Sequence, residues 1–264
     1  MKKERGGKWA ALITVAVMLL APIVPACSPA REPVSLTVGA GAGLSEVLPV
    51  LKEAFERAYP SVRVNLTFGS AGTLAAQVRQ GAPLDALVVP SGGGHLDALV
   101  QEGCLLPDSR VVVAADELVL AVSVSSPVSE DPWSWLAGPK VRRIALGDPQ
   151  TVPAGTYALQ TLRHLGLAER VGPRLLYART VRQALAYVEQ GEAEAALVYR
   201  STLRGSNRVR LAAVAPPEAH EPIVFEGAVL KATRHTEEAR RFLEYLRTPE
   251  AVRVLEEYGF KRPE

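Results

Sequence analysis

Cysteine and histidine are scarce in this chain, whose 264 residues include two cysteines and four histidines. So few cysteines exclude a disulfide-rich scaffold, and no cysteine or histidine group has the spacing of a metal site. A Gly-x-Ser-x-Gly motif is also missing, and His95, His164, His220 and His235 have no partner spaced for a catalytic pair. We therefore expect no enzyme, no metal bound directly by protein ligands and no cofactor.

An excess of one charge is lacking as well. Lys and Arg together number 30 and Asp and Glu 28, which gives a net charge of +2. Because no basic stripe is present, nucleic acid is not an expected partner. Apolar residues make up 48% of the chain and charged residues 22%. This balance is typical of a globular protein, and the length allows one domain or two small ones.

The N-terminus carries a long apolar run, Trp9 to Val24, directly after a basic segment. This order predicts a signal peptide over residues 1–26. The following Val-Pro-Ala-Cys resembles the bacterial lipobox, in which the cysteine receives a diacylglycerol. We therefore expect lipidation of Cys27, a short tether over 27–33 and a protein held to the membrane outside the cytoplasm. An ordinary secreted protein cut nearby, or an uncleaved anchor, is the alternative.

Strand-like and helix-like segments alternate along the rest of the chain. The apolar runs Ser35–Val38, Val62–Phe68 and Ala86–Val89 each lead through a glycine-containing loop into an amphipathic helix pattern. Consecutive strand–loop–helix units predict a parallel sheet with ligand space beyond the carboxyl ends of its strands. The same plan starts again at Val141–Leu146, and Pro222–Leu230 reads as a strand that returns to the first sheet.

We therefore predict an α/β protein with two lobes, each a mostly parallel sheet flanked by helices, and a ligand cleft between them. The predicted first lobe comprises residues 33–118 and 221–264, and the second comprises residues 119–220. Several strands that link two lobes make a hinge, so a small ligand would be enclosed in the cleft.

The segment Asp148–Ala158 is the strongest candidate for a ligand contact. It reads as the end of a strand, a loop and the first turn of a helix, with Pro153 at a position where no N–H is needed. The first N–H groups of a helix have no partner inside the helix, and the macrodipole adds positive charge there. An oxyanion can therefore bind without Lys or Arg. An ordinary helix N-terminus without a ligand is the alternative.

The glycine-rich loop Gly39–Gly43 invites comparison with a dinucleotide-binding motif. The third glycine of that motif is missing, because the matching positions hold Leu44 or Glu46. We interpret the loop instead as a second helix N-terminus, capped by Gly43 or by Ser45.

Taken in order over residues 34–261, several short motifs resemble the periplasmic molybdate-binding proteins of ABC transporters. The most specific are Gly147-Asp148-Pro149, Val152–Ala158, Val181–Leu185, Val198-Tyr199 and Tyr258-Gly259-Phe260. The resemblance implies a type II periplasmic binding protein fold in which molybdate or tungstate lies between the lobes on neutral hydrogen-bond donors. It also implies a monomer that delivers the anion to an ABC transporter permease.

Carried over by position, the resemblance implies anion contacts from the backbone N–H groups of Gly43, Ala71, Ala154 and Val181 and from the Tyr199 hydroxyl. The family carries serine at two of these positions, where this chain has Gly43 and Ala71. Two hydroxyl donors are therefore absent. The alternative function is binding of a different anion or small solute by the same fold.

Overall fold

The structure is a computed structural model that describes residues 33–263. The predicted signal peptide and Cys27 lie outside the described residues, as does nearly all of the predicted tether. Pro33–Glu264 forms one compact unit. Among residues 33–263 no helix combines the length and the apolar character that crossing a membrane requires.

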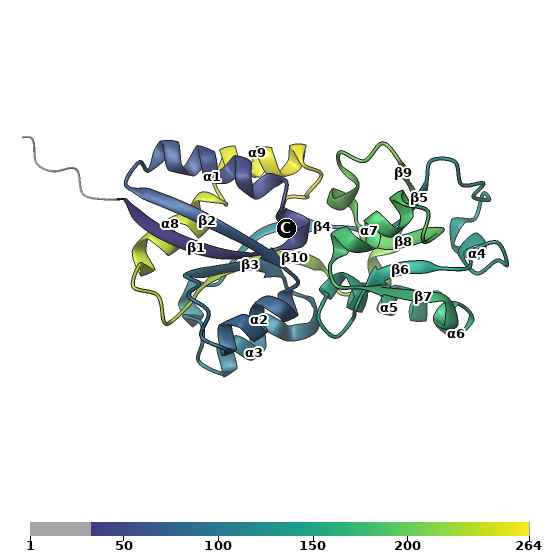
Figure 1. The fold of residues 1–264 in the computed structure, drawn as a ribbon, viewed down its shortest axis with the longest axis horizontal. Coiled ribbons are helices and arrows are strands. Elements are labelled where there is room, and N and C mark those ends of the chain that lie inside the picture. Colours follow the sequence, from purple (N-terminus) through teal and green to yellow (C-terminus); the bar gives the residue numbers. More distant parts are fainter. Residues whose placement is uncertain (1–32, 264) are drawn as a thin grey trace, which may run out of the picture. The chain divides into compact units, whose positions relative to one another are not determined.

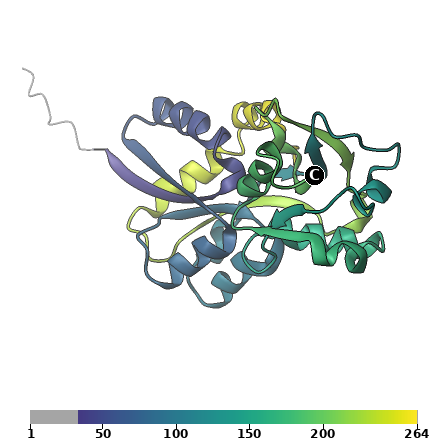
Figure 2. The ribbon, with the colours of Figure 1, turned by 45° about the vertical axis from the view of Figure 1, so that its right-hand side comes forward.

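The first sheet has five strands in the order β2-β1-β3-β10-β4 (Figure 1). Their bounds are Val34–Gly41 for β1, Val62–Gly69 for β2, Ala86–Pro90 for β3, Val111–Asp116 for β4 and Ile223–Val229 for β10. β1 pairs in parallel with β2 and β3, whereas β10 runs antiparallel to β3 and β4. Figure 2 shows β10, in yellow-green, among the purple and blue strands. The late segment thus returns to the first sheet.

The second sheet repeats this arrangement in the order β7-β6-β8-β5-β9. Its strands are β5 Leu118–Ser123, β6 Ile144–Gly147, β7 Leu175–Ala178, β8 Ala195–Tyr199 and β9 Val209–Val214. β6 is parallel to β7 and β8, and β5 is antiparallel to β8 and β9. The chain passes from the first sheet to the second at Glu117 and returns between Val214 and Ile223.

Helices cover both sheets, and we call each sheet with its helices a lobe. The first lobe has α1 Val47–Ala58, α2 Ala71–Arg79, α3 His95–Gln101, α8 Thr236–Tyr245 and α9 Pro249–Glu257. The second has α4 Pro132–Leu136, α5 Pro153–His164, α6 Ala168–Val171 and α7 Val181–Glu189. Three 3-10 turns bear on the site: η1 Ala42–Leu44, η2 Gly92–Gly94 and η5 Arg200–Leu203.

The central strand β3 shows why the first sheet needs helices on both faces. Ala86 and Val88 belong to one apolar cluster, together with residues of α1, α8 and α9. Leu87 and Val89 belong to another, with residues of α2 and α3. Successive side chains of a strand point to opposite faces, so a strand that is apolar throughout is buried on both. Figure 1 shows α1 and α9 above this sheet and α2 and α3 below it.

The predicted two-lobed α/β fold is confirmed, with two corrections in detail. Both sheets are mixed rather than mostly parallel, because β10 is antiparallel to β3 and β4, and β5 is antiparallel to β8 and β9. The edge strands β4 and β9 were not predicted. Neither Gly43 nor Ser45 caps α1, whose N-cap is Glu46. The residues before it form the 3-10 turn η1, which ends at Leu44. Pro49 fits this later start, since a proline in the first turn removes no intrahelical hydrogen bond.

Candidate functional site

A small cavity of about 20 Å³ lies where the two lobes meet. The first lobe lines it with Gly41, Ala42, Gly43, Gly69, Ser70, Ala71, Pro90 and Phe225, and the second with Val152, Pro153, Val181 and Tyr199. Four of the five predicted site residues are among them. The fifth, Ala154, follows a lining residue and is fully buried. This volume is close to that of one water and far below that of a drug-sized pocket, so the cavity does not accommodate a large organic ligand.

A larger hollow of about 730 Å³ lies at the opposite end of the first sheet. Its lining includes Ser35, near the start of β1, and Asp85, which precedes β3. These are the amino ends of the strands, whereas open α/β sheets bind ligands beyond the carboxyl ends. None of the predicted site residues lines this hollow, so the small cavity is the better candidate.

The first lobe presents the N-terminus of α2 to the cavity. Ser70 is the N-cap, and its Oγ accepts a hydrogen bond from the Thr73 N–H at 3.2 Å. The Gly72 N–H donates to the Thr151 carbonyl of the second lobe at 2.9 Å. Among the described residues no acceptor is found for the N–H of Ala71, the first residue of the helix, nor for that of Gly43 in η1. Both N–H groups are therefore available to a ligand.

The second lobe contributes two further helix N-termini. At α7, the Thr180 side chain accepts from Gln183 N–H at 3.1 Å, and no acceptor within residues 33–263 is found for the Val181 N–H. At α5, Pro153 has no N–H, and the N–H of Ala154 likewise has no acceptor in the described chain. Thus all four predicted N–H groups stand at the start of a helical turn, where the helix itself cannot satisfy them.

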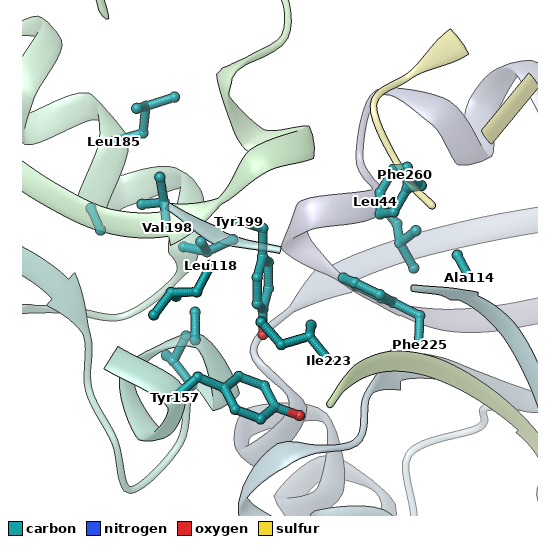
Figure 3. Packing of buried hydrophobic residues seen from close by; sticks show 14 of the residues in the cluster. Leu44, Ala114, Leu118, Tyr157, Leu185, Val198, Tyr199, Ile223, Phe225 and Phe260 are labelled. Atoms are coloured by element: carbon teal, nitrogen blue, oxygen red, sulfur yellow. The ribbon is translucent and has the colours of Figure 1, made fainter. Parts of the chain in front are cut away.

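Tyr199 brings a buried polar side chain to the cavity lining. It is 1% exposed, and no hydrogen-bond partner of its hydroxyl is found in the described part of the chain. Its ring stands between Tyr157 and Phe225, with centroids 6.5 and 5.5 Å away (Figure 3). Burial raises the Tyr199 pKa well above its ordinary value, so the hydroxyl keeps its proton and remains a donor. An unpaired buried hydroxyl costs about 1–3 kcal/mol, which a ligand acceptor would recover.

The cavity lining contains no charged residue. The nearest cation in sequence is Arg182, whose guanidinium pairs with Glu46 of the first lobe at 2.7 Å. Asp148 lies in the loop before α5, where its Oδ1 accepts from the Gln150 N–H at 3.0 Å and its carbonyl accepts from Thr151 and Val152. Asp148 therefore braces this loop. Within the described chain, no group of three or more His, Cys, Asp or Glu residues is placed to hold a metal ion.

Sequence reasoning missed Phe225 and Pro90 as lining residues. Phe225 lies on β10, which was predicted as a strand, but nothing in its local pattern indicated that its ring reaches the ligand space. Pro90 ends β3. Its position at a strand's carboxyl end, directly before a glycine-rich loop, is the signal that could have identified it.

Two lobes of one chain that enclose a small cavity are the architecture of a solute-binding protein. The chain belongs to the bacterial extracellular solute-binding protein family, whose model matches residues 36–261. Members of this family bind solutes for ABC transporters and are not enzymes.

Individual relatives align with this chain over most of their length. The chain is 33% identical over 230 residues to YvgL of Bacillus subtilis, provisionally named an ABC transporter substrate-binding lipoprotein, and the match covers 87% of each chain. It is 32% identical to the molybdate-binding protein ModA of Haemophilus influenzae, covering 85% of this chain and 89% of the relative. The structure of the periplasmic molybdate-binding protein of Azotobacter vinelandii superposes with a TM-score of 0.77 at 26% identity, covering 87% of this chain and 100% of that one.

Proposed function

We propose that this protein captures a tetrahedral oxyanion, molybdate or tungstate, between its lobes and delivers it to an ABC transporter. The observation that carries the proposal is that residues with unsatisfied donors from both lobes line one small, uncharged cavity. Gly43, Ala71 and Val181 line that cavity and have N–H groups for which residues 33–263 offer no acceptor, and the Tyr199 hydroxyl likewise has no partner among those residues. Relatives named as molybdate-binding proteins support the choice of anion.

Neutral donors are sufficient to hold a dianion in such a place. Hydrogen bonds to a charged acceptor contribute about 1.5–3 kcal/mol each, and helix N-termini add favourable dipoles that need no counter-charge. Selectivity then rests on size and on complete hydrogen bonding, because an oxyanion oxygen left without a donor is costly to bury. A small cavity lined by residues with backbone donors suits both requirements.

A second candidate is a different anion or small solute bound by the same site. The observation that favours it is the absence of hydroxyls at Gly43 and Ala71. Ser70, which lines the cavity, is engaged with Thr73 through both its capping bond and a hydroxyl contact at 2.8 Å. It offers at most its own proton to a ligand, so two lost hydroxyls are not simply replaced.

Isothermal titration of the chain from Ser28 onward with molybdate, tungstate, sulfate and phosphate tests the proposal. We expect tight binding of the first two and little heat from the smaller anions. Binding of sulfate or phosphate alone would favour the second candidate. No heat with any of the four would contradict an oxyanion site of this kind.

The same proposal includes the location. We place the protein outside the cytoplasm, as a monomer anchored through a lipid on Cys27, and the provisional lipoprotein name of the Bacillus relative supports this. Mass spectrometry of the protein from its native membrane, compared with a Cys27→Ala variant, tests the anchor. An unmodified N-terminal segment on the wild-type protein would contradict it.

A further inference from the structure

Two glycines of the first lobe touch the second lobe at places where a side chain would not fit. A Cβ on Gly72 would lie 2.7 Å from the Thr151 Cα and 3.0 Å from its carbonyl oxygen. A Cβ on Gly92 would lie 2.6 Å from Cζ of Tyr157 and 2.8 Å from its hydroxyl. Neither glycine is among those with positive φ. The backbone conformation therefore does not require glycine at these positions, but the approach of the other lobe does.

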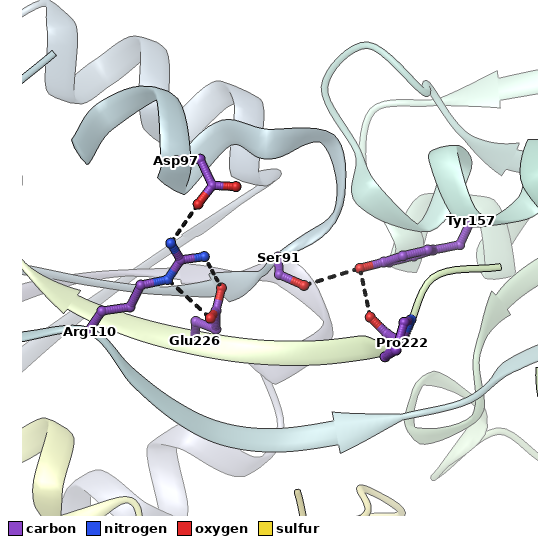
Figure 4. Close-up of polar contacts among 6 residues, drawn as sticks. All are labelled: Ser91, Asp97, Arg110, Tyr157, Pro222 and Glu226. Atoms are coloured by element: carbon purple, nitrogen blue, oxygen red, sulfur yellow. Dashed lines mark hydrogen bonds and ion pairs between the residues drawn. The ribbon is translucent and has the colours of Figure 1, made fainter. Parts of the chain in front are cut away.

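Each glycine lies next to a polar contact between the two lobes. The Gly72 N–H donates to the Thr151 carbonyl at 2.9 Å. Next to Gly92, the hydroxyls of Ser91 and Tyr157 are 3.3 Å apart, and the Tyr157 hydroxyl donates to the Pro222 carbonyl at 3.5 Å (Figure 4). Two of the contacts between the lobes thus share one pattern, in which a hydrogen bond lies beside a glycine that has no side chain.

The Gly72–Thr151 contact adjoins the cavity, and at the other contact the Tyr157 ring centroid lies 6.5 Å from that of Tyr199, which lines the cavity. Gly72 follows Ala71 and Thr151 precedes Val152, and both of these neighbours line the cavity. A contact that moved Thr151 away from α2 would also move the start of α5 away from the first-lobe donors. Hydrogen bonds weaken steeply once the donor and acceptor leave about 2.7–3.2 Å. A displacement of a few tenths of an ångström is thus enough to loosen anion binding.

We infer that Gly72 and Gly92 are positioning residues for anion capture, because their lack of a side chain lets the lobes close far enough for both sets of donors to reach one ligand. They do not touch the ligand. The inference rests on the proposed function for its ligand, but the closure itself can be measured without any anion.

The first experiment compares Gly72→Ala and Gly92→Ala with Gly172→Ala by titration of molybdate and tungstate. Gly172 is a matched control because a Cβ there has no neighbour within 4 Å and its φ is −45°. We expect the first two variants to bind at least tenfold more weakly and Gly172→Ala to bind as the wild type does. Gly72→Val should weaken binding further than Gly72→Ala. Thermal melting of the anion-free proteins should change little, because the open lobes keep their own cores.

A second measurement reports closure without a ligand. Glu46→Cys and Arg182→Cys replace the ion pair that spans the lobes, in a Cys104→Ser background that removes the free thiol of the described chain. A short bis-maleimide should join the two cysteines at least fivefold more slowly when Gly72→Ala or Gly92→Ala is added, and at an unchanged rate with Gly172→Ala.

The two measurements separate the possible failures. Wild-type affinity and unchanged cross-linking in the Gly72 and Gly92 variants would overturn the inference. If the wild type bound no anion but cross-linking were slowed, the molybdate assignment would fail and the role of the glycines would stand. If the wild type bound no anion and cross-linking were unchanged, both would fail.

Discussion

At the scale of the residue, the Tyr199 hydroxyl should favour ligand binding but lower the stability of the ligand-free protein. It is buried without a partner in the described chain, so it costs stability in the absence of a ligand. We expect Tyr199→Phe to weaken molybdate binding by roughly 10- to 100-fold, from about 1.5–3 kcal/mol for a hydrogen bond to an anion, while the anion-free protein becomes as stable or slightly more stable. Calorimetry measures the affinity for molybdate, and thermal melting measures the stability of the anion-free protein. Tyr177→Phe is the control, because Tyr177 is half exposed on β7 and does not line the cavity, so loss of its hydroxyl should change neither quantity.

Substitutions at position 43 test which anion the cavity binds. A Cβ at Gly43 would lie 3.6 Å from Tyr199, 3.7 Å from Val181 and 3.8 Å from Phe225, all ordinary contact distances. A serine is therefore tolerated, and its hydroxyl adds a donor beside the cavity. If the ligand is molybdate, Gly43→Ser should raise the affinity several-fold, with Gly43→Ala as the control for the added methylene. A loss of affinity in both variants would indicate that the natural ligand fills the space next to Gly43.

At the scale of the element, the cap of α7 links helix stability to the site. Thr180 accepts from Gln183 N–H and precedes Val181, whereas Thr248 caps α9 in the same way at Ala251 N–H. Loss of either cap should cost about 0.5–2 kcal/mol of unfolding free energy. We expect Thr180→Ala alone to weaken anion binding as well, because it loosens a donor-bearing turn. Denaturant unfolding and calorimetry of Thr180→Ala and Thr248→Ala check this, and equal affinities would argue against Val181 as a donor.

Elements with a local signature were predictable, and elements defined by their partners were not. The glycine loops before α2 and α5, followed by amphipathic patterns, identified strand–loop–helix units correctly because capping and periodicity are local. Strands β4 and β9 were missed because neither leads into an α-helix, so the strand–loop–helix signature is absent from both. The start of α1 was misplaced by a few residues because a 3-10 turn at Ala42–Leu44 takes up the same glycine-rich segment.

At the scale of the whole molecule, the cavity depends on contacts that no local pattern predicts. Phe225 reaches the ligand space from β10, and Gly72 approaches Thr151 from another lobe. The resemblance to a known family provided the candidate donors by position, but the residues that bring the lobes together became visible only in three dimensions. That α5 begins with N–H groups the helix itself cannot pair, in contrast, was predicted from the local pattern alone, because every helix leaves its first N–H groups unpaired.

The segment in which the chain passes from the first lobe to the second carries a buried carboxyl, and this carboxyl makes the stability of the fold depend on pH. Asp116 ends β4, and burial raises its pKa from 3.8 to about 7, although its Oδ1 accepts from the N–H groups of Glu117 at 2.7 Å and Ser201 at 3.4 Å. Below about pH 4 the carboxyl is protonated in the folded and unfolded states. Between about pH 4 and 7 only the folded state holds the proton, so Asp116 lowers the unfolding free energy progressively as the pH rises.

Asp116→Asn should remove this dependence. The amide oxygen can accept the same two backbone hydrogen bonds and never ionises, so the variant should be more stable than the wild type at pH 8 and close to it at pH 4. Denaturant unfolding of both proteins from pH 4 to 8 measures the difference, with Asp108→Asn as the control, since Asp108 is exposed and pairs with Arg240 at the surface. Parallel stability curves for wild type and Asp116→Asn would show that Asp116 ionises in the fold without penalty, and that the segment between the lobes is open to water.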